Sequence, residues 1–420
     1  MVGDVCREET MIRDQLDRPL RLAVSFDVEV EAGGGYQQAL NACILAAGLP
    51  AALCIPQFFA TSRENVETLA THGIEARHLP FGMWARRESL LWAILGKDRR
   101  AANLLHIVRG SVPLERALGD SVDLIYLTSP STLAFGLERL NYLATIWDEA
   151  NRDEPEFPEI RRSWINYGRE RLHRENARRA AGIFVDSERS RMALAYRHGI
   201  DIDRIHVLPF SPAVRISDIA DVPDVASIRK KYQLDCDYVF YPAQFWAHKN
   251  HVYILRALKR IETERGKRIG AIFSGADKGN RAYVIETANT LGLSDRVRFA
   301  GFVRDAEITE LYRSSLALVM PTYFGPTNLP PLEAFSLGVP VIYSDRPGLR
   351  DQVGDAALLV DLNDPGALAA AIVRIQEDPS LRAFLIAEGQ RQLSKVTDES
   401  RHSTLCKVLS NFRSRRICWP

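Results

Sequence analysis

The sequence predicts an α/β protein built from two domains. At 420 residues the chain is longer than one ordinary hydrophobic core, so two domains are expected. From Leu20 onward, apolar runs typical of buried strands alternate with helical patterns, as in α/β folds. Between residues 211 and 236 this alternation stops, and Pro and Asp recur. We therefore expect the boundary between the two domains in that stretch.

The composition argues against several classes of protein. A net charge of +1 gives no global field for binding nucleic acid. The nine histidines show no HxH or HExxH spacing, so no metal site is expected. The six cysteines form no CxxC pair, which suits a reducing compartment. The charged N-terminus is unlike a signal peptide, and Gly48 and Pro50 interrupt the longest apolar region, so we expect a soluble cytoplasmic protein.

The first half begins with a strand at residues 20–26 (LRLAVSF), a Gly-rich loop at 33–35 and a helix from about 37 to 47. Such a loop lets the backbone approach a ligand, but it can equally be a permissive turn. It lacks the spacing of a dinucleotide-binding fingerprint. Further strands are predicted at 52–55, 122–127, 142–147, 182–187 and 205–210, and helices at 63–73, irregularly over 81–116, and at 188–198.

Residues 160–182 predict a long helix that is rich in Arg. One interpretation is a solvated face with salt bridges along it. The other is attraction to an anionic acceptor or to a membrane surface.

The second half is organised around residues 320–342 (MPTYFGPTNLPPLEAFSLGVPVI), which follow an apolar strand. A loop dense in Gly and Pro leads into a short helix at 332–337, and Gly338 ends that helix. Free N–H groups at a helix N-terminus can bind phosphate or sugar oxygens, and the Glu333 carboxylate can accept hydrogen bonds from ribose hydroxyls. A strand, a loop and a short helix in this order also occur in α/β proteins that bind no ligand there. Other strands are predicted at 238–242, 269–275, 295–303 and 357–360, and helices at 251–265, 307–315 and 364–377.

Residues 329–334 (LPPLEA) and 338–341 (GVPV) resemble the signature of family-4-type, or group 1, glycosyltransferases of the GT-B fold. The family has an earlier Glu, and here Gly325, or Phe324 if one residue is inserted, stands in its place. Lys249 matches the family's diphosphate-binding Lys, whereas Gln244 stands where its Arg is expected. The resemblance covers residues 237–375 closely and 20–210 loosely.

In the first half, residues 145–148 resemble the family's His-Asp-x-x-His loop, with Asp148 matching in type. Trp147 and Asn151 stand at the two His positions. Trp147 and Asp148 can equally cap the core and the loop. The loop at 33–36 resembles the first loop of GT-B enzymes.

The resemblance implies a GT-B architecture, in which two Rossmann-like, doubly wound domains face a cleft. We expect a polar extension at 1–19, an acceptor domain at 20–212, a linker at 213–236, a donor domain at 237–390, and helices at 391–420 that pack back on the first domain. The residues implied as catalytic are Asp148, Asn328 and Lys249. Those implied to bind the donor are Lys249, Gln244, Gly275, Val303, Thr327, Asn328, Leu329 and Glu333. Those implied to bind the acceptor are Gly34, Gly35, Tyr36 and Asn151.

The leading hypothesis is a retaining, metal-independent hexosyl- or deoxyhexosyltransferase that uses a nucleotide-sugar donor. Its acceptor would be a glycan or a lipid-linked glycan in polysaccharide or lipopolysaccharide assembly, with peripheral association at the inner face of a membrane as a further expectation. A second hypothesis is a degenerate GT-B protein that binds a glycan or partner without turnover. A third is a nucleotide-sugar epimerase, which needs acid and base carboxylates, and Asp148 is the one placed in the site.

Overall fold

The computed structural model describes residues 18–213, 225–325 and 327–419, and it divides into two compact units. Unit 1 consists of residues up to Trp147, residues 168–209 and residues 398–420. Unit 2 consists of residues 148–167 and 210–397. Most of the polar extension and part of the linker expected from the sequence lie outside the described residues.

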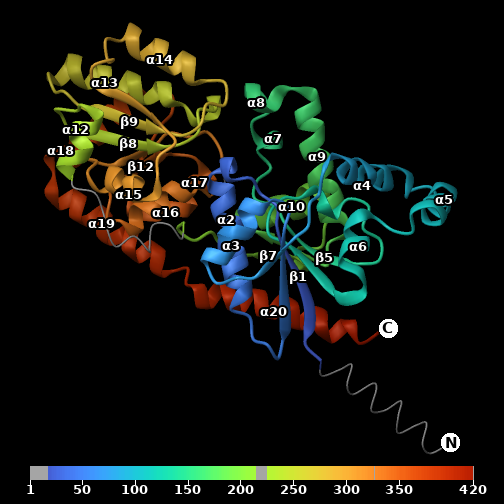
Figure 1. Cartoon of the computed structure of the whole chain (residues 1–420). Coiled ribbons are helices and arrows are strands. Elements are labelled where there is room, and N and C mark those ends of the chain that lie inside the picture. Colours follow the sequence, from blue (N-terminus) through green and yellow to red (C-terminus); the bar gives the residue numbers. More distant parts are fainter. Residues whose placement is uncertain (1–17, 214–224, 326, 420) are drawn as a thin grey trace, which may run out of the picture. The chain divides into compact units, whose positions relative to one another are not determined.

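Unit 1 is built on a parallel sheet of seven strands in the order β3-β2-β1-β4-β5-β6-β7. Three of these strands, β1, β5 and β7, are labelled in Figure 1. Its strands are β1 (Leu20–Phe26), β2 (Cys54–Ala60), β3 (Ala76–His78), β4 (Leu124–Leu127), β5 (Asn141–Thr145), β6 (Gly182–Val185) and β7 (Ile205–Val207). Its helices are α2 (Gly34–Ala47), α3 (Arg63–Thr71), α4 (Met83–Leu95), α5 (Arg99–Arg109), α6 (Pro113–Leu118), most of α9 (Ser163–Arg179), α10 (Glu188–His198) and α20 (Asp398–Arg416). The strand order reverses between β1 and β4.

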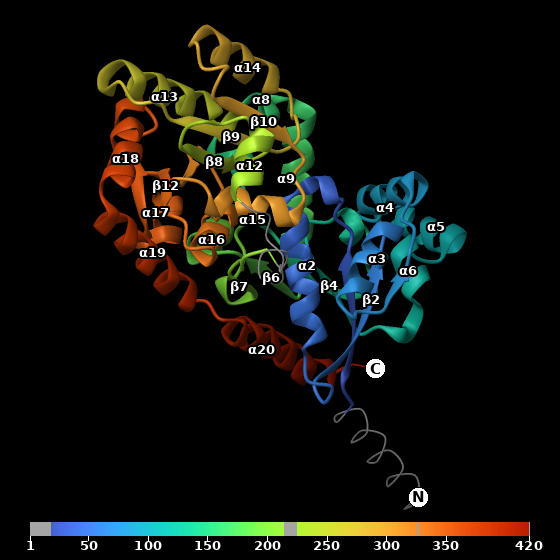
Figure 2. The ribbon, with the colours of Figure 1, turned by 60° about the vertical axis from the view of Figure 1, so that its left-hand side comes forward.

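The last helix, α20, belongs to the core of unit 1 although it is distant in sequence. Its buried side chains Leu405, Leu409 and Phe412 pack in the same apolar cluster as the side chains of β1 and α2. The helix lies beside α2 in both views (Figures 1 and 2), and His402 Nε2 lies 2.9 Å from the Gly48 carbonyl oxygen. Burial of these apolar side chains is the reason that the C-terminal helix packs against the first half of the chain.

Unit 2 is built on a parallel sheet of six strands in the order β10-β9-β8-β11-β12-β13. Its strands are β8 (Tyr238–Pro242), β9 (Gly270–Ser274), β10 (Val297–Gly301), β11 (Leu318–Met320), β12 (Val341–Ser344) and β13 (Ala357–Val360). Its helices are α7 (Ala150–Asp153), α8 (Pro158–Arg161), α12 (Val225–Tyr232), α13 (His251–Arg265), α14 (Arg281–Thr290), α15 (Asp305–Arg313), α16 (Leu329–Ser336), α17 (Pro347–Val353), α18 (Pro365–Glu377) and α19 (Pro379–Ser394). Here the order reverses between β8 and β11.

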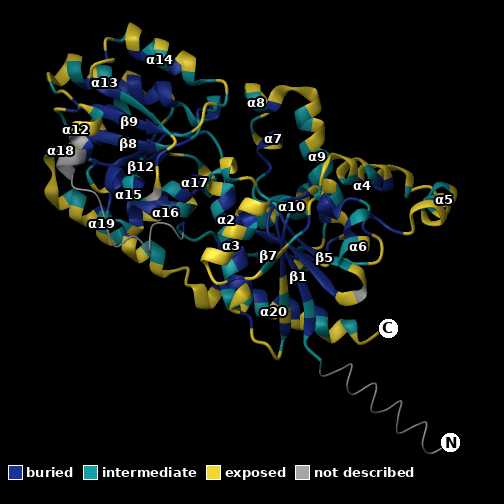
Figure 3. Ribbon diagram, in the orientation of Figure 1, coloured by how far each residue is buried: buried dark blue, intermediate teal, exposed yellow. Residues whose placement is uncertain are grey.

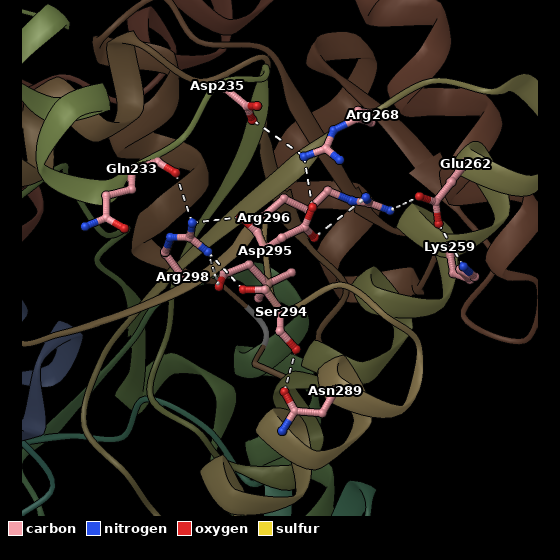
Figure 4. Close-up of polar contacts among 11 residues, drawn as sticks. Gln233, Asp235, Lys259, Glu262, Arg268, Asn289, Ser294, Asp295, Arg296 and Arg298 are labelled. Atoms are coloured by element: carbon pink, nitrogen blue, oxygen red, sulfur yellow. Dashed lines mark hydrogen bonds and ion pairs between the residues drawn. The ribbon is translucent and has the colours of Figure 1, made fainter.

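A polar network at the start of β10 holds the end of α12 to the sheet of unit 2 (Figure 4). Arg298 Nε donates to the Tyr232 carbonyl (2.6 Å), and its Nη2 donates to the Gln233 carbonyl (2.9 Å). Arg296 is almost fully buried, and its guanidinium lies 2.9 Å from the Glu262 carboxylate. Because the charge of Arg296 is paired within the protein, we give this network a structural role and not a ligand-binding one.

The predicted α/β class with two doubly wound sheets is confirmed. The edge strand β3 is missing from the sequence prediction, since its three residues (Ala-Arg-His) lack an apolar pattern. Helix α16 begins three residues earlier than predicted, because Pro330 and Pro331 are compatible with the first turn of a helix.

One segment differs in its assignment. The sequence analysis placed residues 148–167 in the first domain, whereas their contacts place them in unit 2. The segment 391–420, predicted to pack back on the first domain, contains the last turn of α19, which belongs to unit 2, and the whole of α20, which belongs to unit 1.

Candidate functional site

The candidate site of unit 2 lies where the strand order reverses, at the carboxyl ends of β8 and β11. Ligands of open α/β sheets bind at such switch points. Lys249 ends the short helical turn after β8, and Asn250, at φ 54°, lets the chain enter α13. Asn328 precedes α16, which follows β11. Lys249 Nζ donates a hydrogen bond to Asn328 Oδ1 at 3.3 Å, so two of the predicted catalytic residues are in direct contact.

Asn328 is held by side chains from β12 and α17. Its Nδ2 donates to the Tyr343 hydroxyl (2.6 Å), and that hydroxyl donates to Gln352 Oε1 (3.0 Å). Gln352 also accepts from the Asn328 N–H (3.0 Å) and donates from Nε2 to the Asn328 carbonyl (2.6 Å). These bonds fix the amide so that its oxygen faces Lys249. Sequence reasoning missed Tyr343 and Gln352, because nothing near them marks a site.

The helix N-terminus offers fewer donors than the sequence suggested. The Asn328 N–H is already used by Gln352, and Pro330 and Pro331 have no N–H. The other two residues of the first turn, Leu329 and Leu332, carry the N–H groups that the prolines lack. The Lys249 ammonium is therefore a stronger candidate for binding an anion than the helix end is.

Gly325 occupies the position where the resembling family has its first carboxylate. Its φ of 109° lies in a region that side chains rarely adopt, and a Cβ built there would lie 3.0 Å from the Asn328 amide. Phe324, the alternative position, instead stacks on the His248 ring at 3.8 Å between centroids. Neither position therefore presents a carboxylate, and Thr327 and Asn328 are the polar side chains nearby in sequence.

Burial lowers the pKa of the Lys249 ammonium to about 8, while the charges of Asp148 and Glu159 act in the opposite direction. The ammonium is thus charged at neutral pH and loses its proton in the mildly alkaline range. The third predicted catalytic residue, Asp148, therefore lies within electrostatic reach of Lys249, and both are in unit 2. Asp148 Oδ1 also accepts from the Ala150 N–H (2.9 Å) at the start of α7.

Within the segment 148–167, residues 154–159 make the contacts with the other loops of unit 2. Glu159 Oε1 accepts hydrogen bonds from the main-chain N–H of His248 (3.1 Å) and from its Nδ1. Burial lowers the pKa of His248 to about 4, so the ring is neutral and donates the Nδ1 proton to the carboxylate. The ring of Phe157 packs against Tyr323 at 5.2 Å, and Glu154 forms an ion pair with Arg346.

Glu333 is almost completely buried, with 2% of its surface exposed, and lies in the second turn of α16. The helix predicted at 332–337 would have placed Glu333 in its first turn. Its Oε2 accepts from the Tyr312 hydroxyl at 2.8 Å, which orients the carboxylate. A ligand hydroxyl would therefore have to reach into the protein to meet it.

The other predicted donor residues lie on neighbouring loops of the same sheet edge. Gln244 follows β8, and its Oε1 accepts from Trp246 Nε1 at 2.9 Å. Gly275 follows β9 at φ 142°, and a Cβ there would lie 2.5 Å from the Ala243 carbonyl oxygen, so only Gly fits. Val303 follows β10 and is buried. Leu329 is buried and Thr327 is partly buried.

Three of the four predicted acceptor residues lie in unit 1, at the start of α2. Gly34, Gly35 and Tyr36 form the first turn of α2. Tyr36 is buried and donates to Thr68 Oγ1 (2.8 Å). A Cβ on Gly35 would lie 2.7 Å from the Trp147 ring, so Gly35 gives that ring room. Asn151, the fourth residue, is buried in unit 2 and therefore belongs to a different unit.

A carboxylate that the sequence analysis missed lies at the switch point of unit 1, between β1 and β4. Asp27 directly follows β1, and its oxygens accept from the hydroxyls of Ser129 (2.9 Å) and Ser131 (2.5 Å), which follow β4. Burial raises the pKa of Asp27, and the two hydroxyls and the charge of Arg86 act against that rise. Asp27 lies more than a hundred positions before the two serines in sequence, so no local motif could reveal this cluster.

An apolar cavity of about 140 Å³ lies at the same edge of this sheet. Thr61 follows β2, Leu79 and Phe81 follow β3, and Leu133 lies two residues after Ser131. The edge thus combines one carboxylate with an apolar hollow.

Among the described residues, no group of three or more His, Cys, Asp and Glu side chains is placed to hold a metal ion. Within the same residues, no helix has both the length and the apolar character needed to cross a bilayer.

The two parallel sheets of seven and six strands, with their flanking helices, match the fold of solved GT-B glycosyltransferases. Residues 224–392 match the family described as "Glycosyl transferases group 1", so the chain carries a domain of that family. The resemblance seen in the sequence is thereby confirmed.

The relatives agree with this assignment. The O-antigen chain mannosyltransferase B of Escherichia coli is 29% identical over 68% of this chain and 73% of its own length. The D-inositol 3-phosphate glycosyltransferase of Acidothermus cellulolyticus is 31% identical over 45% of this chain and 44% of its own length. The crystal structure of Anabaena HepE in complex with UDP and glucose superposes with a TM-score of 0.68 at 16% identity, covering 93% of this chain and 99% of the other.

Proposed function

We propose that this chain is a retaining glycosyltransferase that moves a hexose or deoxyhexose from a nucleotide sugar to a glycan or lipid-linked acceptor in surface-polysaccharide assembly. The observation that carries the proposal is the contact between Lys249 and Asn328 at the switch point of unit 2. This pair lies inside the segment that matches group 1 glycosyl transferases. The O-antigen mannosyltransferase supports the polysaccharide context, and the HepE complex with UDP supports a nucleotide donor.

The donor would bind to unit 2 with its diphosphate at Lys249. As the bond between the anomeric carbon and the diphosphate oxygen breaks, negative charge grows on the diphosphate, and the ammonium stabilises that charge. Glu333 would accept hydrogen bonds from the ribose hydroxyls. Asn328, fixed by Tyr343 and Gln352, would hold both Lys249 and the sugar. No metal ion takes part in this scheme.

The acceptor would bind to unit 1 at the Asp27 cluster. A carboxylate that already accepts from two hydroxyls is suited to accepting from a sugar hydroxyl. The apolar cavity at the same edge of the sheet would suit the aliphatic part of a lipid-linked acceptor. In retaining transfer the acceptor oxygen bonds to the anomeric carbon on the face that the diphosphate leaves, and the proton of the acceptor hydroxyl passes to the departing diphosphate oxygen.

A panel of nucleotide sugars tests the proposal. Binding of the correct donor raises the melting temperature of the purified protein by mass action. That donor, incubated with extracted glycan or lipid-linked acceptors, should give a glycoside whose anomeric configuration matches the donor's by NMR. An inverted product would overturn the retaining assignment, and no stabilisation by any nucleotide sugar would overturn the donor assignment.

A second candidate function is binding of a glycan without turnover. The observation that favours it is the conformation of Gly325, which keeps a carboxylate out of the position that the family fills. Gln244 in place of Arg removes a second charged group. Stabilisation by a nucleotide sugar with neither transfer nor donor hydrolysis, across all acceptor extracts, would support this candidate.

A further inference from the structure

Helices α4 and α5 of unit 1 expose an unusual amount of apolar surface. Of the twenty large apolar side chains that are exposed among the described residues, nine lie on these two helices. They are Met83, Trp84, Leu90, Leu91, Ile94, Leu95, Leu104, Ile107 and Val108. We call residues 83–109 the α4–α5 hairpin. Figure 3 shows both helices as largely exposed.

On each helix the exposed apolar residues share one face. In α4, Met83, Leu90 and Ile94 recur at helical spacing, while Trp92 and Ala93 on the other side are buried. In α5, Leu104 and Ile107 are 62% and 82% exposed, and no residue of this helix is buried. Soluble surfaces rarely gather so many apolar side chains without a partner, so this face is suited to an apolar environment.

The α4–α5 hairpin also carries positive charge. The hairpin contains six Lys and Arg residues and two acidic residues. Both acidic side chains are engaged, because Glu88 pairs with Arg116 (2.8 Å) and Asp98 caps α5 through the Ala101 N–H (2.9 Å). The Arg87 guanidinium lies 5.5 Å from the centre of the exposed Trp84 ring. The exposed cations are Arg86, Arg87, Lys97, Arg99, Arg100 and Arg109.

We propose that the α4–α5 hairpin docks on the surface of a bilayer that contains anionic lipid. Apolar residues and Trp beside Arg and Lys are the composition of interfacial helices, whose apolar side enters the acyl boundary while their cations meet headgroup phosphates. A second copy of this chain would have to bring these cations against one another, which disfavours self-association through this face. Docking here does not depend on sugar transfer.

Vesicle co-sedimentation of the full chain tests the proposal. The protein should sediment with vesicles of phosphatidylcholine and phosphatidylglycerol, and binding should fall at least tenfold on pure phosphatidylcholine or at high salt. The double variant Trp84→Ser, Ile107→Ser should lower binding at least tenfold, and Arg99→Glu, Arg100→Glu should do the same. All four residues are exposed, so these variants should fold, and an unchanged melting temperature checks this.

Helix α10 provides a matched control, because it exposes Tyr196 (91%) and Arg189 in the same unit. Tyr196→Ser and Arg189→Glu should bind vesicles like the parent. Equal loss in the α10 variants, or no binding to anionic vesicles by the parent, would overturn the proposal. So would a dimer by light scattering that the Trp84→Ser, Ile107→Ser variant disrupts. Donor hydrolysis without lipid should be unchanged in the hairpin variants, so failure of docking and failure of the proposed transfer are told apart.

Discussion

The two switch points of this molecule share an architecture but carry opposite charges. In unit 1, where β1 meets β4, the group at the sheet edge is the Asp27 carboxylate with two Ser hydroxyls. In unit 2, where β8 meets β11, it is the Lys249 ammonium with the Asn328 amide. A cation attracts a diphosphate, and a carboxylate attracts hydroxyl donors. The comparison teaches that one sheet design can serve two different ligands through the residues that follow its central strands.

The largest effect is expected at Lys249. Lys249→Ala should lower transfer by about 10²–10³-fold, because it removes the charge that stabilises the departing diphosphate. Transfer is measured as released nucleotide with saturating donor. Lys259, a partly exposed cation on α13 paired with Glu262, gives the matched control, and Lys259→Ala should behave like the parent. Equal activity of Lys249→Ala and the parent would show that Lys249 does not stabilise the departing diphosphate.

The second-largest loss of transfer activity is expected at Asn328. Asn328→Ala removes a hydrogen bond to a charged group, which corresponds to a loss of roughly 10–100-fold in transfer. Binding of the free nucleotide, measured by calorimetry, should survive, because Lys249 and Glu333 remain. Activity equal to that of the parent would contradict the role given to Asn328.

Asp27 tests the other side of the comparison. Asp27→Asn should raise the KM for the acceptor by about tenfold, as expected for losing a hydrogen bond to a charged acceptor, while donor hydrolysis stays the same. Asp123 offers a control carboxylate at the opposite end of the same strands. There, burial acts to raise the pKa, but hydrogen bonds from Arg18 and Arg21 bring it below its usual range. Asp123→Asn should destabilise the fold by about 1–3 kcal/mol and leave the acceptor KM unchanged.

The smallest effect concerns pH. Activity should decline above about pH 8 as the Lys249 ammonium loses its proton, since its pKa is about 8. Glu159 raises that pKa, so Glu159→Gln should move the decline to lower pH by about a few tenths of a unit. Full pH profiles of kcat/KM for the donor measure this shift. A decline that moves to higher pH would show that Glu159 does not act on Lys249.

Much of the fold could be predicted from sequence, because alternating apolar runs and Gly- or Pro-rich loops are local signals. The contact between Lys249 and Asn328 could be anticipated only through a family resemblance, since the two residues lie on different loops. The Asp27 cluster could not be predicted, because an Asp after a strand is ordinary until Ser129 and Ser131 meet it. No local signal indicates that residues 148–167 pack in unit 2, because the hydrogen bond between Glu159 and His248 joins residues 89 positions apart.

The most direct test of the division between the two units is a paired measurement of nucleotide affinity. Calorimetry with the nucleoside diphosphate is carried out on the parent, Lys249→Ala and Asp27→Asn. The account predicts that affinity falls at least tenfold in Lys249→Ala and is unchanged in Asp27→Asn. Equal losses in both variants, or a loss confined to Asp27→Asn, would contradict the assignment of the donor to unit 2.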